Sequence, residues 1–265
     1  MCTVTVVRAD SSAAWCAGPA LFRLVCNRDE QRSRPPSSPP VCRQLGARAA
    51  IMPIDPTSGG TWIGANDAGL IACLLNTNPP TSDPHRAEAG TARRELRSRG
   101  EIVPALLGSS TIEEARGRAG GIDARWFPPF RVLVLGAEAC TIVSSDGASL
   151  SITDPAPLES TMLLTSSGLG DEVVELPRRE VFEELMFSAR DRFAAQDEFH
   201  RHRWPRAPQL SVLMSRPDAR TVCRSEVTLF PGSIVFSHVH LDDDLDAGAA
   251  PSVLEVLWRR AEVVA

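Results

Sequence analysis

Short β-prone segments, separated by turn residues, occupy both ends of the chain and constrain its fold more than any other feature. Residues 2–7, 21–26 and 221–229 are rich in Val, Leu, Thr and Cys, which suit a pleated, half-buried sheet. The segments with helical character lie between and after these runs, without the regular strand–helix alternation of a parallel sheet. We therefore expect an α+β fold with mainly antiparallel sheets.

The remaining elements follow from local patterns. Residues 32–40 are rich in Pro and Ser and can neither pair as a strand nor continue a helix, so they predict a surface loop. Apolar residues at helical spacing predict a helix over 180–193, and composition favours helices within 91–119 and 253–263. Turn signals bound further expected strands at residues 61–64, 70–75, 130–135, 140–144, 161–165, 212–214 and 233–239. No linker interrupts this order, so we expect residues 1–265 to form one domain.

Composition excludes several mechanisms and partners. All 28 basic residues are arginine and tyrosine is absent, which excludes Schiff-base lysine, Ser-Lys and tyrosine-acid mechanisms. A net charge of −5 argues against nucleic acid as a partner. We therefore expect the ligand to be a small molecule, and no cofactor is implied.

Cysteine usage and hydropathy predict the compartment. No apolar run approaches the ~20 residues needed to cross a bilayer, and the N-terminus lacks the pattern of a secretory leader. Seven scattered cysteines without a C-x-x-C pair disfavour a disulfide framework and a structural zinc site. We expect a protein of the reducing cytoplasm.

Cys2 is the first candidate for chemistry, because it directly follows the initiator methionine. Methionine is normally removed before a side chain as small as cysteine, which would leave a free α-amine on Cys2. An α-amine with a pKa of ~7.7–8.0 can serve near neutral pH as the base for its own thiol, as in N-terminal-nucleophile enzymes. The alternative is that Cys2 is a small buried hydrophobe, the usual role of a free cysteine.

The segment Asn27-Arg28-Asp29-Glu30 follows the second expected strand, and on its own it is typical of a solvated turn. The blocks that follow it in order are RP at 34–35, GGTWIG at 59–64, LLN at 74–76, SRG at 98–100 and MSRPDARTV at 214–222. Together with Cys2, these blocks resemble the NRDE family, also called the transport and Golgi organisation protein 2 family. The resemblance implies an N-terminal-nucleophile-hydrolase-like αββα sandwich with two mainly antiparallel sheets.

A wider resemblance to cholylglycine hydrolases and penicillin V acylases implies roles for several residues. Their R-N-x-D segment is similar to residues 26–29, which makes Asp29 the group that orients the α-amine or the thiol. Cys26 stands where those enzymes have arginine, so Arg28 becomes the candidate for the positive charge. Residues 64–76 are similar to the segment that ends in their oxyanion-hole asparagine, which assigns Asn76 to that hole.

The same resemblance implies a pocket and one more catalytic position. Ser166 stands where the acylases have a second asparagine, and we expect it in the substrate pocket with Asn27 and Trp62. For Trp62 a core position is an equally good interpretation. Arg224 corresponds to a late-strand arginine of those enzymes, although neighbouring arginines compete for the role.

Four of the five histidines form two H-x-H pairs, 200/202 and 238/240, and the second pair precedes three aspartates. On a strand, both imidazoles of a pair would share one face and could ligate a zinc, iron or haem-like centre. The alternative is surface histidine beside an acidic tail. We favour the alternative, and no metal is assigned.

Two classes of function follow. The first is an amidohydrolase in which Cys2 attacks a small amide or thioester substrate. The second is a non-catalytic protein on the same fold that binds an apolar ligand such as haem or an acyl lipid, as the association of animal family members with Golgi organisation and with haem or lipid handling implies. The departures at Cys26 and Ser166 support the second hypothesis. Cys2, Asp29 and Asn76 support the first, which we favour.

Overall fold

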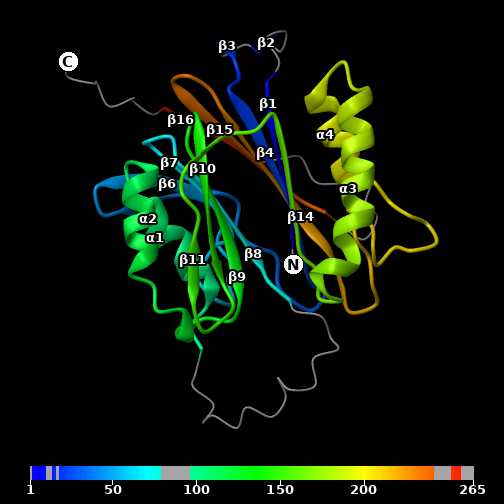
Figure 1. Cartoon of the computed structure of the whole chain (residues 1–265), viewed down its shortest axis with the longest axis horizontal. Coiled ribbons are helices and arrows are strands. Elements are labelled where there is room, and N and C mark those ends of the chain that lie inside the picture. The colour runs from blue at the N-terminus through cyan, green and yellow to red at the C-terminus, as the bar shows by residue number, and fades with distance from the viewer. Residues whose placement is uncertain (1, 10–13, 16–17, 79–95, 242–251, 258–265) are drawn as a thin grey trace.

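Two antiparallel β-sheets stack face to face, and a pair of helices covers the outer face of each sheet (Figure 1). The computed structural model describes residues 2–9, 14–15, 18–78, 96–241 and 252–257. Strand pairs in both sheets are antiparallel in these residues. The αββα sandwich confirms the expected α+β fold with two mainly antiparallel sheets.

The first sheet holds the start of the chain between two other strands. β1 (Cys2–Arg8) lies between β13 (Thr161–Thr165) and β4 (Phe22–Gln31), with Cys2 opposite Arg28. Beyond β4 follow β14 (Ala219–Leu229), β15 (Ser233–His240) and β16 (Ser252–Leu257), and a separate hairpin contains β2 (Ala14–Trp15) and β3 (Gly18–Pro19). Because β1 has a neighbour on each side, residues from both neighbours reach Cys2.

The second sheet brings one strand end toward the start of β1. β8 (Ile71–Asn76) pairs with β9 (Phe130–Leu135), and β1 packs against β8 across the sandwich. The other strands of this sheet are β5 (Val41–Leu45), β6 (Arg48–Met52), β7 (Ile63–Asn66), β10 (Ala139–Ser145), β11 (Leu150–Ile152) and β12 (Ala156–Pro157).

The helices begin where the sequence supplies capping groups. Thr111 accepts a hydrogen bond from the Glu114 N–H at the start of α2, and Asp191 accepts two at the start of α4. α1 and α2 cover the second sheet, whereas α3 and α4 cover the first. The helices are η2 (Arg99–Glu101), α1 (Ile102–Leu107), α2 (Ile112–Gly120), η3 (Ala124–Trp126), α3 (Asp171–Ser188) and α4 (Arg192–Arg201).

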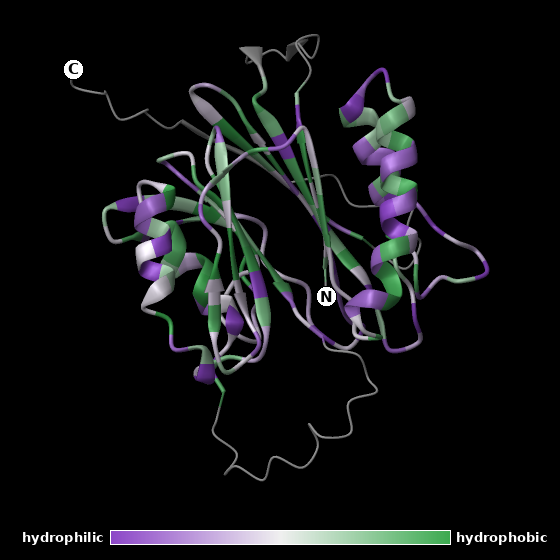
Figure 2. Ribbon diagram, viewed as in Figure 1, coloured by the Kyte–Doolittle hydropathy of each residue, from purple (hydrophilic) through white to green (hydrophobic). Residues whose placement is uncertain are grey.

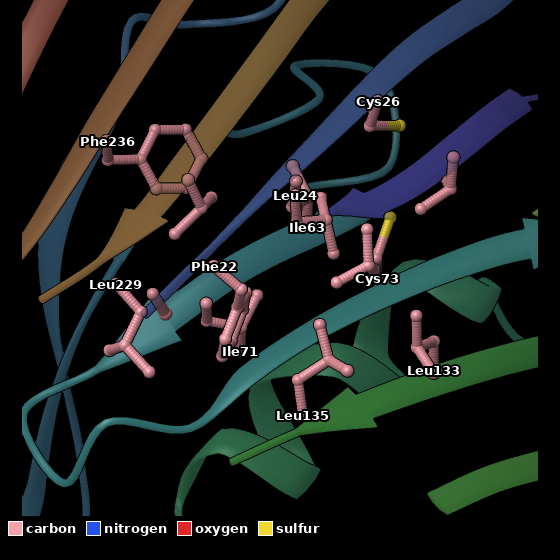
Figure 3. Close-up of a cluster of buried hydrophobic side chains, with 14 of the residues drawn as sticks. Phe22, Leu24, Cys26, Ile63, Ile71, Cys73, Leu133, Leu135, Leu229 and Phe236 are labelled. Atoms are coloured by element: carbon pink, nitrogen blue, oxygen red, sulfur yellow. The ribbon is translucent and has the colours of Figure 1, made fainter. Parts of the chain in front are cut away.

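Alternation along the strands of the first sheet divides its side chains between two environments. Even-numbered residues of β1 and β4, such as Val4 and Leu24, belong to the apolar core between the sheets. Figure 3 shows Leu24 in this core, and Figure 2 shows hydrophobic stretches along the strands of both sheets. Odd-numbered residues point toward α3 and α4, where the Thr3 and Thr5 hydroxyls hydrogen-bond to Arg178 and His200. The first sheet therefore separates Cys2, on its core-facing side, from a polar layer on its helix-facing side.

Several local predictions were wrong. The helix expected over 180–193 is two helices, since α3 ends at Ser188 and Asp191 caps a new one. Residues 212–214 form no strand, because the Val212 carbonyl accepts a hydrogen bond from a side chain. The final helix expected over 253–263 is instead the strand β16 as far as Leu257, and its remainder lies outside the described residues.

Candidate active site around Cys2

Cys2 begins β1, and its backbone is held by the residue that follows β13. The Cys2 nitrogen donates to the Ser166 hydroxyl at 3.0 Å, and the Ser166 N–H donates to the Cys2 carbonyl at 2.9 Å. Both side chains are buried, with Cys2 4% exposed. Ser166 therefore fixes the nitrogen that would become the α-amine if Met1 were removed.

A cavity of about 190 Å³ lies in front of Cys2. Its lining includes three of the residues predicted for the site, Arg28, Trp62 and Asn76, and Arg99. They come from β4, the 55–62 loop, the end of β8 and the start of η2. The cavity thus lies where the ends of β1, β4 and β8, interior strands of the two sheets, meet the 97–100 segment.

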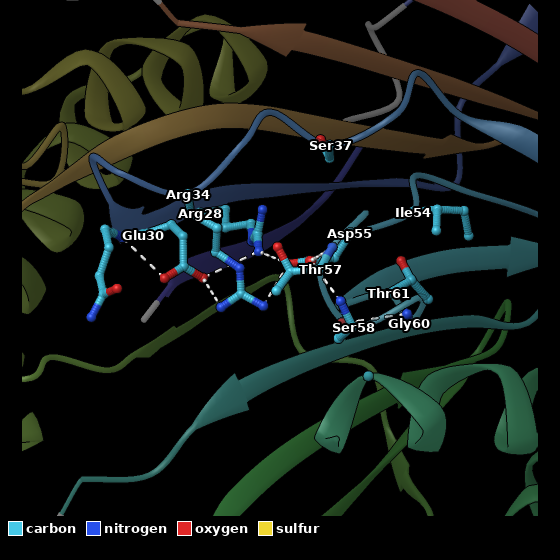
Figure 4. A network of polar contacts seen from close by, with 12 residues as sticks. Arg28, Glu30, Arg34, Ser37, Ile54, Asp55, Thr57, Ser58, Gly60 and Thr61 are labelled. Atoms are coloured by element: carbon cyan, nitrogen blue, oxygen red, sulfur yellow. Dashed lines mark hydrogen bonds and ion pairs between the residues drawn. The ribbon is translucent and has the colours of Figure 1, made fainter. Parts of the chain in front are cut away.

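Arg28 is part of a network of two arginines and two carboxylates (Figure 4). Its guanidinium pairs with Asp55 and with Glu30, the latter at 3.1 Å, and stacks 4.2 Å from the centre of the Trp62 ring. Arg34 joins the same carboxylates at 3.1 and 3.3 Å. Burial raises the pKa of Asp55, but Arg28, backbone N–H donors and Arg34 outweigh that effect and lower its pKa overall. Asp55 therefore stays ionised and holds Arg28 against the cavity wall.

The Cys2 thiol belongs to a chain of buried thiols. A hydrogen bond with Cys26, followed by burial, raises the pKa of Cys2 well above its usual value. The bond to Cys2 lowers the pKa of Cys26, but a hydrogen bond with Cys73 and burial raise it overall. Burial also raises the pKa of Cys223 to about 12. Cys2 is thus a neutral thiol at rest, and a nearby base is required to remove its proton.

Asp29 lies on the helix-facing side of β4. The Thr221 hydroxyl donates to its carboxylate at 2.6 Å. Burial raises the pKa of Asp29, and the charge of Arg178 and the Thr221 hydrogen bond oppose this. β14 has an irregularity between Thr221 and Cys223 that shifts its pairing with β4. As a result, Thr221 lies opposite Asp29.

Arg178 is a functional candidate that the sequence analysis missed. Its side chain, 1% exposed, donates to the Thr3 and Thr165 hydroxyls at 2.8 and 2.7 Å and to the carbonyls of Leu210 and Ser211. It thereby ties α3 to β1 and β13 beside Cys2. An arginine within an amphipathic helix normally faces solvent, so no sequence signal distinguished this one.

Asn27 and Arg224 are not brought to the cavity. The Asn27 amide donates to the carbonyls of His200 and Val212, at 2.9 and 3.1 Å, in the layer beneath α4. Arg224, opposite Asn27 in the neighbouring strand, is surrounded by the charges of that same layer. Asn27 is next to Arg28 in β4 and so points to the opposite face, and Arg224 shares that face because it is paired directly with Asn27.

Asn76 ends β8 at the cavity. Within the described residues, its side-chain amide has no hydrogen-bond partner. The amide N–H is therefore available to a ligand carbonyl oxygen.

The two histidine pairs differ from each other. His200 and His202 lie at the end of α4 and not on a strand, and the His200 ring bonds to Thr5. His238 and His240 share a face of β15, with ring centres 4.8 Å apart. In the part of the chain that the structure describes, no group of three or more metal-ligating side chains converges, and the aspartates 242–244 lie outside it.

Comparison of sequences places the chain in a family. Residues 1–198 match the family model described as Transport and Golgi organisation 2. The chain belongs to the Transport and Golgi organisation 2 family. This result confirms the resemblance carried by Cys2 and the NRDE segment. No curated protein sequence is similar enough to the chain to count as a match.

Two solved structures similar to this Transport and Golgi organisation 2 member carry the names of hydrolases. The Caenorhabditis elegans ortholog of N-acylethanolamine-hydrolyzing acid amidase is 12% identical, with a TM-score of 0.52, over 84% of this chain and 91% of that one. The C2A mutant of conjugated bile acid hydrolase from Clostridium perfringens is 10% identical, with a TM-score of 0.50, over 99% and 98%. These similarities confirm the N-terminal-nucleophile-hydrolase-like fold. No helix in the described residues has the length and apolar character to cross a membrane.

Proposed function

We propose that this family member is a hydrolase that uses Cys2 to cleave an amide bond of a small molecule. The observation that carries the proposal is the position of Cys2 at the wall of a polar cavity with Asn76 and Arg28. Cys26, Cys73 and Cys223 are equally buried in the core but do not line that cavity. Cys2 is thus the buried core cysteine whose thiol a ligand in this cavity could meet.

The chemistry begins with loss of Met1, which leaves the Cys2 nitrogen as a primary amine. The Ser166 hydroxyl, 3.0 Å away, orients that nitrogen. The amine takes the thiol proton as the sulfur attacks the carbonyl carbon, and the oxygen becomes an oxyanion. The ammonium then protonates the leaving nitrogen, and the C–N bond breaks. Water hydrolyses the resulting thioester, with its proton passing through the same amine to the sulfur.

Asn76 supplies the complementary donor. Its amide N–H would bind the oxyanion more strongly than the ground-state carbonyl, because negative charge develops only during the attack. The raised pKa of Cys2 fits this scheme, since the thiol keeps its proton until a base and a substrate are both in place. Asp29 and Arg178 act as positioning residues behind β1.

The cavity disfavours the apolar-ligand hypothesis for this site. Four arginines and two carboxylates are among its lining residues, and burying them under haem or an acyl chain would cost more than apolar contact returns. A volume of about 190 Å³ is also below the ~300–1,000 Å³ of typical ligand pockets. A small polar substrate fits better.

The test compares variants on a panel of small N-acyl amides, after mass spectrometry of the N-terminal peptide. We expect Met1 to be absent, Cys2→Ala to abolish hydrolysis, and Cys42→Ala, which changes an exposed cysteine, to leave it intact. Asn76→Ala should lower kcat by roughly 10²–10³-fold with little change in KM. Retained Met1, or turnover unaffected by Cys2→Ala, would refute the proposal.

A further inference from the structure

Arg99 differs from the other arginines that line the cavity. Three of them have carboxylate partners: Arg28 and Arg34 share Asp55 and Glu30, and Arg97 pairs with Glu101. Arg99 donates to the Pro129 carbonyl at 2.8 Å, and no carboxylate of the described residues lies within 4.0 Å of its guanidinium. Among the described residues, Arg99 is thus the cavity arginine that has no direct ion-pair partner.

The backbone of Arg99 is held tightly against the cavity wall. The Thr61 N–H donates to the Gly100 carbonyl at 3.0 Å, and the Ser98 hydroxyl accepts from the Gly100 N–H at 3.2 Å. Gly60 and Gly100 touch so closely that a Cβ on Gly60 would lie 2.6 Å from the Gly100 carbonyl carbon. Two glycines thus let the 98–100 segment approach the 59–62 loop and bring Arg99 to the cavity.

The surroundings of Arg99 make its charge effective. Burial lowers the pKa of Arg99 overall, although Glu30 and an ionised Cys2 oppose the shift. Because the pKa of arginine starts at ~12.5 or above, the side chain stays a cation near neutral pH, within electrostatic reach of Cys2. A guanidinium that is half withdrawn from water interacts with an anion more strongly than one at the surface, because the local dielectric is lower.

We propose that Arg99 binds a carboxylate of the substrate, so that the enzyme acts on small amides that carry a carboxylate near the scissile bond. The planar donor fork of arginine matches the two oxygens of a carboxylate. The small cavity limits the occupant to a compact acid. This inference rests on the proposed function and names the substrate class of the same site.

The first test measures alkylation of Cys2 by iodoacetate, a carboxylate, and by iodoacetamide, its neutral counterpart. Exposed Cys42 in the same chain serves as the internal reference. Mass spectrometry of both peptides gives the rate ratio of the two reagents at each cysteine. A charge-assisted contact predicts a ratio at Cys2 roughly 10–100-fold above that at Cys42.

Variants test whether Arg99 causes the preference of Cys2 for iodoacetate over iodoacetamide. Arg99→Gln should bring the Cys2 ratio to that of Cys42, and Arg99→Lys should retain part of it. Arg125→Gln, which removes an exposed cation outside the cavity lining, should leave it unchanged. Equal ratios at the two cysteines of the unmodified protein, or an unaltered ratio in Arg99→Gln, would overturn the inference.

A second measurement separates this inference from the proposed function. Cys2→Ala protein is titrated with N-acetylglycine and with N-acetylglycinamide. This binding measurement needs no reactive thiol. Tighter binding of the carboxylate, lost in Cys2→Ala/Arg99→Gln, supports the anion site even if no amide is hydrolysed. Equal affinity for the two ligands overturns the carboxylate site even if hydrolysis is found. Stronger competition by inorganic phosphate than by acetate overturns it as well.

Discussion

Replacing Gly60 by alanine tests the contact that places Arg99 at the cavity. An added Cβ would lie 2.6–2.7 Å from three backbone atoms of Gly100, whereas ordinary contact begins near 3.4 Å. Neither segment can yield by rotating a side chain, so the backbone itself must shift. Such overpacking costs about 1–3 kcal/mol, and the lower entropy of the unfolded alanine chain offsets about 0.4–1 kcal/mol. We expect a net loss of about 1.3 kcal/mol in the free energy of unfolding, with these ranges spanning about 0 to 2.6 kcal/mol.

Chemical denaturation of Gly60→Ala beside Gly117→Ala measures this difference. Gly117 lies within α2, is exposed, and has no atom within 4 Å of an added Cβ. Alanine there should stabilise the protein by about 0.5–1 kcal/mol, because it favours the helix. The two substitutions should therefore move the denaturation midpoint in opposite directions.

The reasoning also predicts a functional consequence. When the 98–100 segment moves away, the iodoacetate preference at Cys2 should fall in Gly60→Ala and persist in Gly117→Ala. Gly60→Ala protein with unchanged stability and an unchanged preference would show that the glycine contact neither constrains the fold nor positions Arg99.

Two further predictions concern buried polar groups. Arg178→Met should lower the free energy of unfolding by about 3–5 kcal/mol in chemical denaturation, because it leaves two carbonyls unsatisfied and removes the largest charge that compensates buried Asp29; a loss below about 1 kcal/mol would contradict this. His238 has its pKa lowered to about 3 by burial, by His240 and by Arg28. Since unfolded histidine has a pKa near ~6.5, stability should fall as pH drops from ~6.5 toward 3, by up to ~1.4 kcal/mol per pH unit from this residue. His238→Gln should flatten that dependence, and an identical pH profile for both proteins would refute the assignment.

How well each strand or helix was predicted depended on whether a local sequence pattern marks it. The β1 strand and the 161–165 and 130–135 strands lay within a residue of their predicted bounds, because apolar runs between turn residues are local patterns. β5 and β6 were not anticipated, since the three middle residues of β5 are exposed and give no alternating apolar pattern, whereas pairing with β6 defines the strand. The helix expected at the C-terminal end is a strand as far as Leu257 for the same reason, because pairing with β15 overrides a helical composition.

The sequence alone determined the α+β class, the family and the choice of Cys2 as the candidate nucleophile, because each depends on residue order or periodicity along the chain. The tertiary structure decided which of the NRDE residues face the cavity. Arg28 meets it, whereas Asn27 and Asp29 point toward the helices, since neighbouring residues of a strand alternate between its faces. It also brought Arg99 and Arg178, distant in sequence from Cys2, to either side of β1. Contacts between segments so far apart depend on the packing of both sheets, and no local pattern contains them.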